Sequence, residues 1–217
     1  MSKADLHHGD DALIAAQRLA EWTSRAPELE EDVALANIAL DLLGQARMFL
    51  SRAGDEDQLA YLRTDREFTN VQLVELPNGD FGHTILRLLF FSVYQQQLFA
   101  SMRGDEIADK AAKEVAYHVD HARMWTLRLG DGTEESHGRM QRALDELWPF
   151  THELFEGNDL RAGWLSVVEP ILAEATLTRP EDGWAPTGGR SGVHTQHLSY
   201  LLAEMQVLHR AHPGARW

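Results

Sequence analysis

The chain contains no cysteine, and its 217 residues include only seven prolines and 20 basic side chains. Without thiols it can form no disulfide, no cysteine-ligated metal site and no thiol nucleophile. The 34 acidic side chains give a formal net charge of -14, which argues against a nucleic-acid or anionic membrane partner. No apolar run approaches the roughly 20 residues that cross a bilayer, and the N-terminal sequence lacks the apolar stretch of a signal peptide. These absences predict a cytoplasmic protein.

Because proline and glycine are scarce, long segments run without a helix breaker. No stretch alternates apolar and polar residues in the manner of a strand. We therefore predict an all-α protein. The expected helices cover about 11–25, 28–53, 81–102, 105–129, 134–155, 160–177 and 195–211, with a shorter helical piece at 59–63.

Two of these helices carry a strong apolar signal. The helix at 28–53 contains an apolar ladder whose 4-3-4-3 spacing is typical of a packed helix face. The helix at 81–102 is apolar nearly all round, which predicts that most of its faces are buried. The ladder consists of Leu29, Val33, Ala36, Leu40 and Leu43.

The lengths of the connections indicate the topology. Two helices joined by a tight turn are followed by a connection of some 25 residues and then by two more tightly joined helices. A bundle with one long crossover has this pattern, which is found in ferritin-like folds. We predict a single ferritin-like domain over 1–217, with the core bundle at about 11–129 and additional helices at about 133–211.

A ferritin-like bundle raises the question of a di-iron site. Such a site takes a Glu from each of two helices and a Glu-x-x-His motif from each of the other two. The acid-to-histidine pairs at this spacing are Asp5–His8, Asp80–His83 and Glu134–His137, and all lie at or before an expected helix start. The helix at 81–102 has no carboxylate between Thr84 and Ser101. A four-carboxylate site therefore cannot be assembled from this sequence.

Polar residues nevertheless lie on helices that should be buried. One interpretation is a residual metal site formed by Glu114, His118 and His121 with an open coordination position. The other, which we favour, is a hydrogen-bonded polar layer that fixes the helix register, with His118 as a satisfied core histidine. The polar residues of the second helix are Asn37, Asp41 and Gln45, and those of the fourth are Glu114, His118 and His121.

A buried Asp41 would need a cationic partner, because an unpaired buried carboxylate is costly. Arg47, Arg87 and His118 are the candidates. Near the C-terminus, His194 and His197 follow a flexible loop, and we interpret them as capping and surface residues. The glycine-rich stretch 188–192 lacks the spacing of a nucleotide-binding loop and has no preceding strand.

Several long strings resemble the PaaC family of phenylacetate degradation proteins. Members of that family are the structural subunit of the bacterial ring-1,2-phenylacetyl-CoA epoxidase, a multicomponent monooxygenase. The resemblance spans nearly the whole chain. The strings that carry it are Ala26-Pro27-Glu28-Leu29-Glu30, the run 34–47, Leu76-Pro77-Asn78-Gly79, Lys113-Glu114 with Tyr117-His118, Leu147-Trp148-Pro149-Phe150-Thr151, Thr187-Gly188-Gly189-Arg190 with Gly192, His194-Thr195 and His197-Leu198, and Leu202-Ala203-Glu204-Met205-Gln206.

The resemblance implies that the chain is a decayed copy of a catalytic sister. The sister subunit is ferritin-like and carries the di-iron centre at which phenylacetyl-CoA is epoxidised. Matching its motifs puts Leu42 and Val115 at positions of ligating Glu, and Gln45 at the position of a His, while His118 is retained. The resemblance therefore implies no catalytic residue, no cofactor and no metal in this chain, with di-iron in the partner.

Three hypotheses follow for the function. The leading one is a non-catalytic scaffold subunit that contacts the catalytic subunit through its second helix, on a face that includes Glu30, Ala34, Asn37 and Asp41. It could pair as a homodimer when alone. The alternatives are a metal-dependent oxidase or hydroxylase using Glu114, His118 and His121, and a self-contained helical ligand-binding protein.

Overall fold

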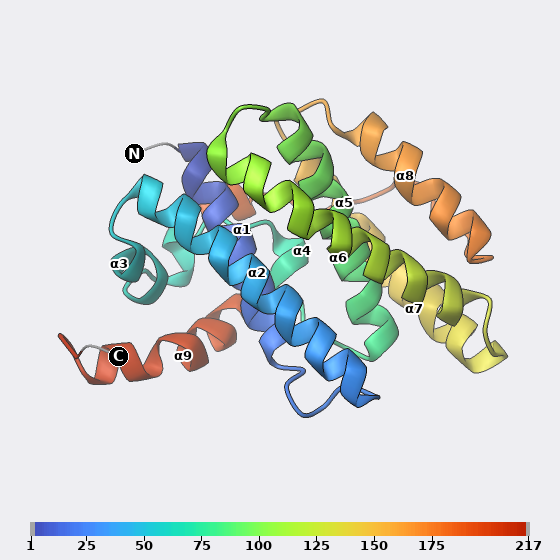
Figure 1. Ribbon diagram of the computed structural model, residues 1–217, viewed down its shortest axis with the longest axis horizontal. Helices are drawn as coiled ribbons and strands as arrows, with labels where there is room; N and C mark the ends of the chain where they lie inside the picture. Colours follow the sequence, from blue (N-terminus) through green and yellow to red (C-terminus); the bar gives the residue numbers. More distant parts are fainter. Residues whose placement is uncertain (1–2, 216–217) are drawn as a thin grey trace. The chain divides into compact units, whose positions relative to one another are not determined.

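The computed structural model describes residues 3–215, which form helices and contain no strand (Figure 1). The all-α class is confirmed, in keeping with a ferritin-like helical fold. The described residues group into two compact units: the first takes 3–77 together with 188–215, and the second takes 78–187. The single ferritin-like domain expected from the sequence stays a prediction.

The first unit is built on a long pair of helices, α1 and α2, which pack along each other (Figure 1). The last helix of the chain, α9, packs on α3, η1 and α4 of this same unit. The unit is therefore discontinuous in sequence. Its elements are α1 (Lys3–Ala20), α2 (Leu29–Ala53), α3 (Glu56–Tyr61), η1 (Asp65–Glu67), α4 (Gln72–Glu75), η3 (Gly189–Ser191) and α9 (Gln196–Ala211).

The second unit is arranged around α5, which contacts α6, α7 and α8. As expected for a helix that is apolar nearly all round, most of α5 is buried. The indole Nε1 of Trp164 donates a 2.9 Å hydrogen bond to the Phe90 carbonyl, and both rings lie against Trp148. The elements are α5 (Phe81–Ser101), α6 (Glu106–Gly130), α7 (Glu134–Thr151), η2 (His152–Phe155) and α8 (Arg161–Glu174).

The first helix differs from its expected bounds. It begins at Lys3 rather than near residue 11, and it ends at Ala20 rather than near residue 25. Acidic residues gather at helix N-termini, so Asp10 and Asp11 resembled a helix start. In the structure both lie in the middle of α1 and are buried, because arginines from distant parts of the chain neutralise them.

These two aspartates tie other segments of the first unit to α1. Asp10 forms a bidentate pair with Arg63 and accepts the backbone N–H of Thr69 at 2.8 Å. Burial raises the pKa of Asp10, and the hydrogen bond from Arg63 opposes that shift. Asp11 receives both terminal nitrogens of Arg190, at 2.9 and 2.7 Å. The carboxylates of α1 therefore hold both the segment after α3 and the C-terminal segment.

A second buried cluster fixes the loop before α9. Glu75 accepts hydrogen bonds from Asn70 Nδ2 at 2.9 Å, from the Thr195 N–H at 2.6 Å and from His194 Nδ1 at 2.8 Å. The other ring nitrogen of His194 donates to the Phe68 carbonyl at 3.0 Å. The His194 side chain is only 3% exposed, so our interpretation of it as a surface residue is wrong.

The glycine-rich stretch is thus a structural clamp. Arg190 points into the first unit, where it also donates to the Thr69 carbonyl. Gly192 has φ +77°, and an added Cβ would lie 2.3 Å from the Arg66 carbonyl oxygen. Only glycine fits this turn without strain. The stretch serves to place Arg190 and His194 against α1 and α4.

We expect Asp11→Ala to lower the free energy of unfolding by about 3–5 kcal/mol, because it leaves Arg190 buried without its carboxylate. Asp41→Ala is the matched control, since Asp41 is half-buried and not in the core. It should cost less than about 1 kcal/mol. Urea unfolding of both variants measures the difference. Equal losses would contradict the assignment of Asp11 as the buried partner.

Candidate interaction surface

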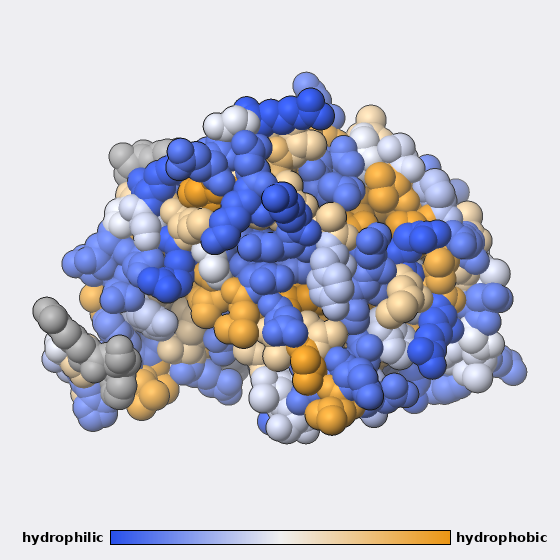
Figure 2. Space-filling model, viewed as in Figure 1, coloured by the Kyte–Doolittle hydropathy of each residue, from blue (hydrophilic) through white to orange (hydrophobic). Residues whose placement is uncertain are grey.

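The apolar ladder of α2 lies on the surface of the first unit. Leu29 is 75% exposed, Val33 54%, Leu40 64% and Leu43 38%. The interpretation of this ladder as the packed face of the helix is therefore wrong. Figure 2 shows hydrophobic side chains reaching the surface along the line of α2. We call the set Leu29, Val33, Ala36, Leu40 and Leu43 the α2 seam.

The packed face of α2 is a second ladder with the same period. Leu35, Ile38, Leu42 and Phe49 are all at most 1% exposed. A helix that is apolar on two sides satisfies the helical period with either side inward, so spacing alone could not decide between the ladders. The seam is the side that α1 and the rest of the first unit leave uncovered.

A shallow groove runs beside the seam, between α1 and α2. Its volume is about 260 Å³, and its walls are mostly alanine and leucine. Such small side chains leave room for larger side chains of another helix to enter. The lining residues are Leu13, Ala16, Gln17, Ala20, Thr23, Ala36, Ala39, Leu40 and Leu43. The groove and the seam together form one continuous apolar surface, which is typical of an interface.

Within residues 3–215, α2 is the one helix long and apolar enough to cross a membrane by length and composition; the mean hydropathy of its best window is 1.3. The same test is passed by helices of soluble proteins that lie in a core. Here 44% of that window is buried inside the structure, and the helix opens with three consecutive acids, Glu30, Glu31 and Asp32. Both features favour protein packing over lipid.

The polar stripe of α2 borders the seam. Asn37 is exposed, Asp41 is half-buried and Gln45 is fully buried. The expectation of a buried polar layer therefore has to be corrected for Asn37 and Asp41, because both lie on the rim of the packed face. Arg47, a candidate partner of Asp41, instead binds Glu56 at 3.0 Å.

The polar residues of the fourth expected helix lie on α6, in the second unit. His118 is 0% and His121 6% exposed, and Glu114 is half-buried. The Tyr117 ring, 51% exposed, lies 6.1 Å from the His121 ring. The choice between a polar layer and a residual metal site at these residues stays open.

The positions matched to lost ligands are apolar and buried. Leu42 on α2 is 1% exposed and Val115 on α6 is 0% exposed. An isobutyl or isopropyl group has no lone pair to give to a metal. Across the described part of the chain, no cluster of three or more His, Cys, Asp or Glu side chains could hold a metal ion.

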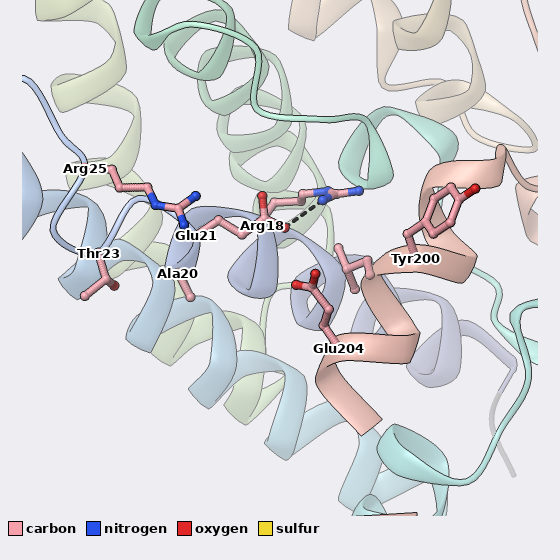
Figure 3. A pocket seen from close by; sticks show the side chains of 8 residues that line it. Arg18, Ala20, Glu21, Thr23, Arg25, Tyr200 and Glu204 are labelled. Carbon is pink, nitrogen blue, oxygen red and sulfur yellow. Dashed lines mark hydrogen bonds and ion pairs between the residues drawn. The ribbon is translucent and has the colours of Figure 1, made fainter. Parts of the chain in front are cut away.

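A polar pocket of about 490 Å³ lies between the end of α1 and α9 (Figure 3). Arg25 and Tyr200 stand on opposite sides of it. Arg18 is committed to structural bonds, since it pairs with Glu21 at 2.6 Å and donates to the carbonyls of Glu75 and His197. The lining contains no histidine and no nucleophile beside a base, so the pocket offers no catalytic arrangement.

Comparison with known proteins identifies the chain. Residues 3–217 match the sequence profile of the family described as "Phenylacetic acid catabolic protein". The chain belongs to this family. It is 45% identical over 240 aligned residues to an Escherichia coli K12 protein that is named as one of the subunits of 1,2-phenylacetyl-CoA epoxidase. The alignment covers 98% of this chain and 97% of that protein, so the family resemblance of the sequence strings is confirmed.

The exposed seam was missed by sequence reasoning, although a signal for it existed. Two ladders of equal period on one helix mean that one of them must face a second neighbour or solvent. The phenylacetic acid catabolic family is now the context for that surface, because the Escherichia coli relative is named as one part of a larger epoxidase.

His83 on α5 provides a test of the second unit. Burial and the nearby Arg87 lower its pKa from 6.5 to about 4. Glu146, 3.9 Å away, would favour the charged form, but its side chain is 70% exposed and screened by water. The unfolded chain therefore binds more protons between pH 6.5 and 4. Stability should fall as the pH drops through this window and level off below it.

We expect His83→Gln to flatten this acid limb of the stability curve. The measurement is the urea midpoint of the wild type and the variant at several pH values from 7 to 4. His137→Gln is the control at a histidine on α7 that lies beside the Gly130 carbonyl. An unchanged acid limb in His83→Gln would show that His83 titrates normally.

Proposed function

We propose that the chain is the non-catalytic scaffold subunit of a phenylacetyl-CoA ring epoxidase complex in the cytoplasm. It would bind and stabilise a ferritin-like catalytic subunit that holds the di-iron centre. The observation that carries the proposal is the exposed α2 seam, an uncovered apolar helix face on a chain whose relative is named as one subunit of an epoxidase. A surface of this kind loses stability in water and gains it when a partner covers it.

The geometry of the seam suits a helix as its partner. Apolar residues spaced every 3.5 positions on average form a straight stripe that packs against a similar stripe at a shallow angle. The groove beside Ala36 and Ala39 would receive the side chains of that helix. The stripe of Glu30, Ala34, Asn37 and Asp41, which is exposed or half-buried, would form the polar rim of the contact.

This contact should be large. An obligate subunit pair buries more than about 2,000 Å² in total, so α1 and the rim of α2 would contribute together with the seam. When the catalytic subunit is missing, the same apolar stripe could pair with a second copy, which would give a homodimer. The chain's net charge of -14 disfavours nucleic acid or an anionic membrane as the partner.

The chain itself would contribute no redox chemistry. Leu42 and Val115 fill with hydrocarbon the positions that the family resemblance assigns to ligating carboxylates, and α5 offers none between Thr84 and Ser101. The competing proposal, a metal-dependent oxidase at Glu114, His118 and His121, draws on two buried histidines three residues apart on α6. Metal content separates the two proposals.

We expect the purified chain to contain far less than one iron per chain when it is prepared without chelators. The physical reason is that Leu42 and Val115 cannot ligate a metal, and two histidines with one half-buried Glu114 make a weak site. Elemental analysis of the wild type and of His118→Ala with His121→Ala provides the measurement and its control. A value near two irons per wild-type chain would overturn the scaffold proposal.

Reconstitution tests the scaffold role directly. The chain alone should show no turnover of phenylacetyl-CoA, and the catalytic subunit alone should be inactive or poorly soluble. The complete set of subunits with the reductase should turn over only when this chain is present. Undiminished activity in its absence would end the proposal.

The seam itself is tested by Val33→Asp with Leu40→Asp. Two buried charges at the centre of the contact should reduce binding of the catalytic subunit at least about 100-fold. Leu208→Asp is the matched control, because Leu208 is an equally exposed leucine (62%) on α9. Thermal unfolding of each isolated variant checks that the fold is kept. Equal binding by the seam variant and the control would exclude the seam as the contact.

A further inference from the structure

Trp184 is an unusual residue on the surface of the second unit. Its side chain is 78% exposed, more than any other large hydrophobic residue in the described part of the chain. It lies in the segment 177–188, which has no helix. Connections of this length without secondary structure are uncommon in compact domains and often carry function.

The segment is held firmly two residues before the tryptophan. Asp182 accepts hydrogen bonds from Arg161 at 2.6 Å, from Arg179 at 3.1 Å and from the indole Nε1 of Trp148 at 3.0 Å. Burial works to raise the pKa of Asp182, but these bonds outweigh it and bring the pKa down to about 2. The carboxylate is therefore ionised and bound at neutral pH.

Further contacts stiffen the same segment. The Arg179 guanidinium lies 4.9 Å from the centre of the Trp148 ring and pairs with Glu169 at 3.1 Å. Pro180 and Pro186 restrict the backbone on both sides of the tryptophan. Trp184 is thus presented to solvent on a loop that loses little entropy when it binds.

The charges around Trp184 select the kind of partner. The two arginines neutralise Asp182, which leaves the exposed Glu181 as the charge beside the tryptophan. The whole chain carries a net charge of -14, so a second copy would be repelled and a basic surface attracted. Large aromatic side chains on stiff loops commonly fill apolar pockets at the centre of protein interfaces.

We propose that Trp184 and Glu181 form a second docking site, which inserts the indole into an apolar pocket bordered by Lys or Arg on another subunit of the epoxidase complex. This inference rests on the proposed function, because it takes the partner from the same complex. It adds a contact on the second unit that is independent of the α2 seam on the first.

The test mixes the purified full-length chain with the purified remaining subunits of the complex and measures the dissociation constant. Trp184→Ala should weaken binding about 30-fold, the effect of an interface hot spot, and Trp184→Phe should weaken it less. Glu181→Lys should also weaken binding and reduce its salt dependence. Tyr200→Ala is the matched control, since Tyr200 is a similarly exposed aromatic residue (68%) on α9. It should change binding less than twofold.

Fluorescence gives a second readout that does not depend on a loss of affinity. Acrylamide should quench Trp184 strongly in the free chain and weakly in the complex. The difference should be absent in Trp184→Phe. Circular dichroism and thermal unfolding of each variant confirm that the loop substitutions leave the fold intact.

The outcomes are distinguishable. If the wild-type chain forms no complex, the proposed function and this inference both fail. If a complex forms but Trp184→Ala binds within twofold of the wild type and Trp184 stays quenchable, the docking site alone is overturned. If sedimentation shows a homodimer that depends on Trp184, the tryptophan binds a second copy and the assigned partner is wrong.

Discussion

Two neighbouring aspartates buried in one helix determine how the first unit is put together. Asp10 and Asp11 lie in the middle of α1 with exposed fractions of 0% and 2%. A carboxylate in such a place is stable only with a cation and hydrogen-bond donors around it. The nearest arginines in sequence do not supply them. Arg63 and Arg190 do, and each brings its own segment onto α1.

The return of Arg190 has a topological consequence. Because residues 188–215 complete the first unit, the whole second unit is an insertion between two parts of the first. The contacts of Glu75 with His194 and Thr195 secure the same junction from α4. Docking of the last helix, α9, therefore depends on a set of buried charges and only secondarily on apolar packing.

The helix bounds could be predicted from the sequence where turn chemistry is strong. Pro27 precedes α2, the Pro77-Asn78-Gly79 turn precedes α5, and Gly104 lies between α5 and α6, so these bounds were right within a few residues. The start of α1 was wrong because the partners of Asp10 and Asp11 lie 53 and 179 residues away. No local pattern shows that an acid will be buried by an arginine so distant in sequence.

The candidate surface was only partly predictable, for a different reason. Periodicity shows that α2 has an apolar face, but Leu35-Ile38-Leu42 and Val33-Ala36-Leu40 satisfy the same period. Which of them faces inward depends on α1, whose contacts follow from the aspartate pairs. The assignment of Leu42 and Val115 came from the family resemblance, and their burial is what hydrocarbon side chains require.

Both units use one device to make a stiff loop, and this bears on what a protein without catalysis of its own gains from its fold. In each unit an acidic side chain gathers donors from separate segments: Glu75 in the first and Asp182 in the second. Such clusters cost desolvation and add little net stability compared with apolar packing. Their physical effect is to fix backbone geometry. A protein that performs no chemistry gains from fixed geometry when its surfaces must match those of a partner, because a preorganised interface loses less entropy on binding. The stiff loop at Trp184 and the uncovered seam on α2 therefore fit the same explanation, in which the chain's structure is devoted to presenting surfaces to its complex.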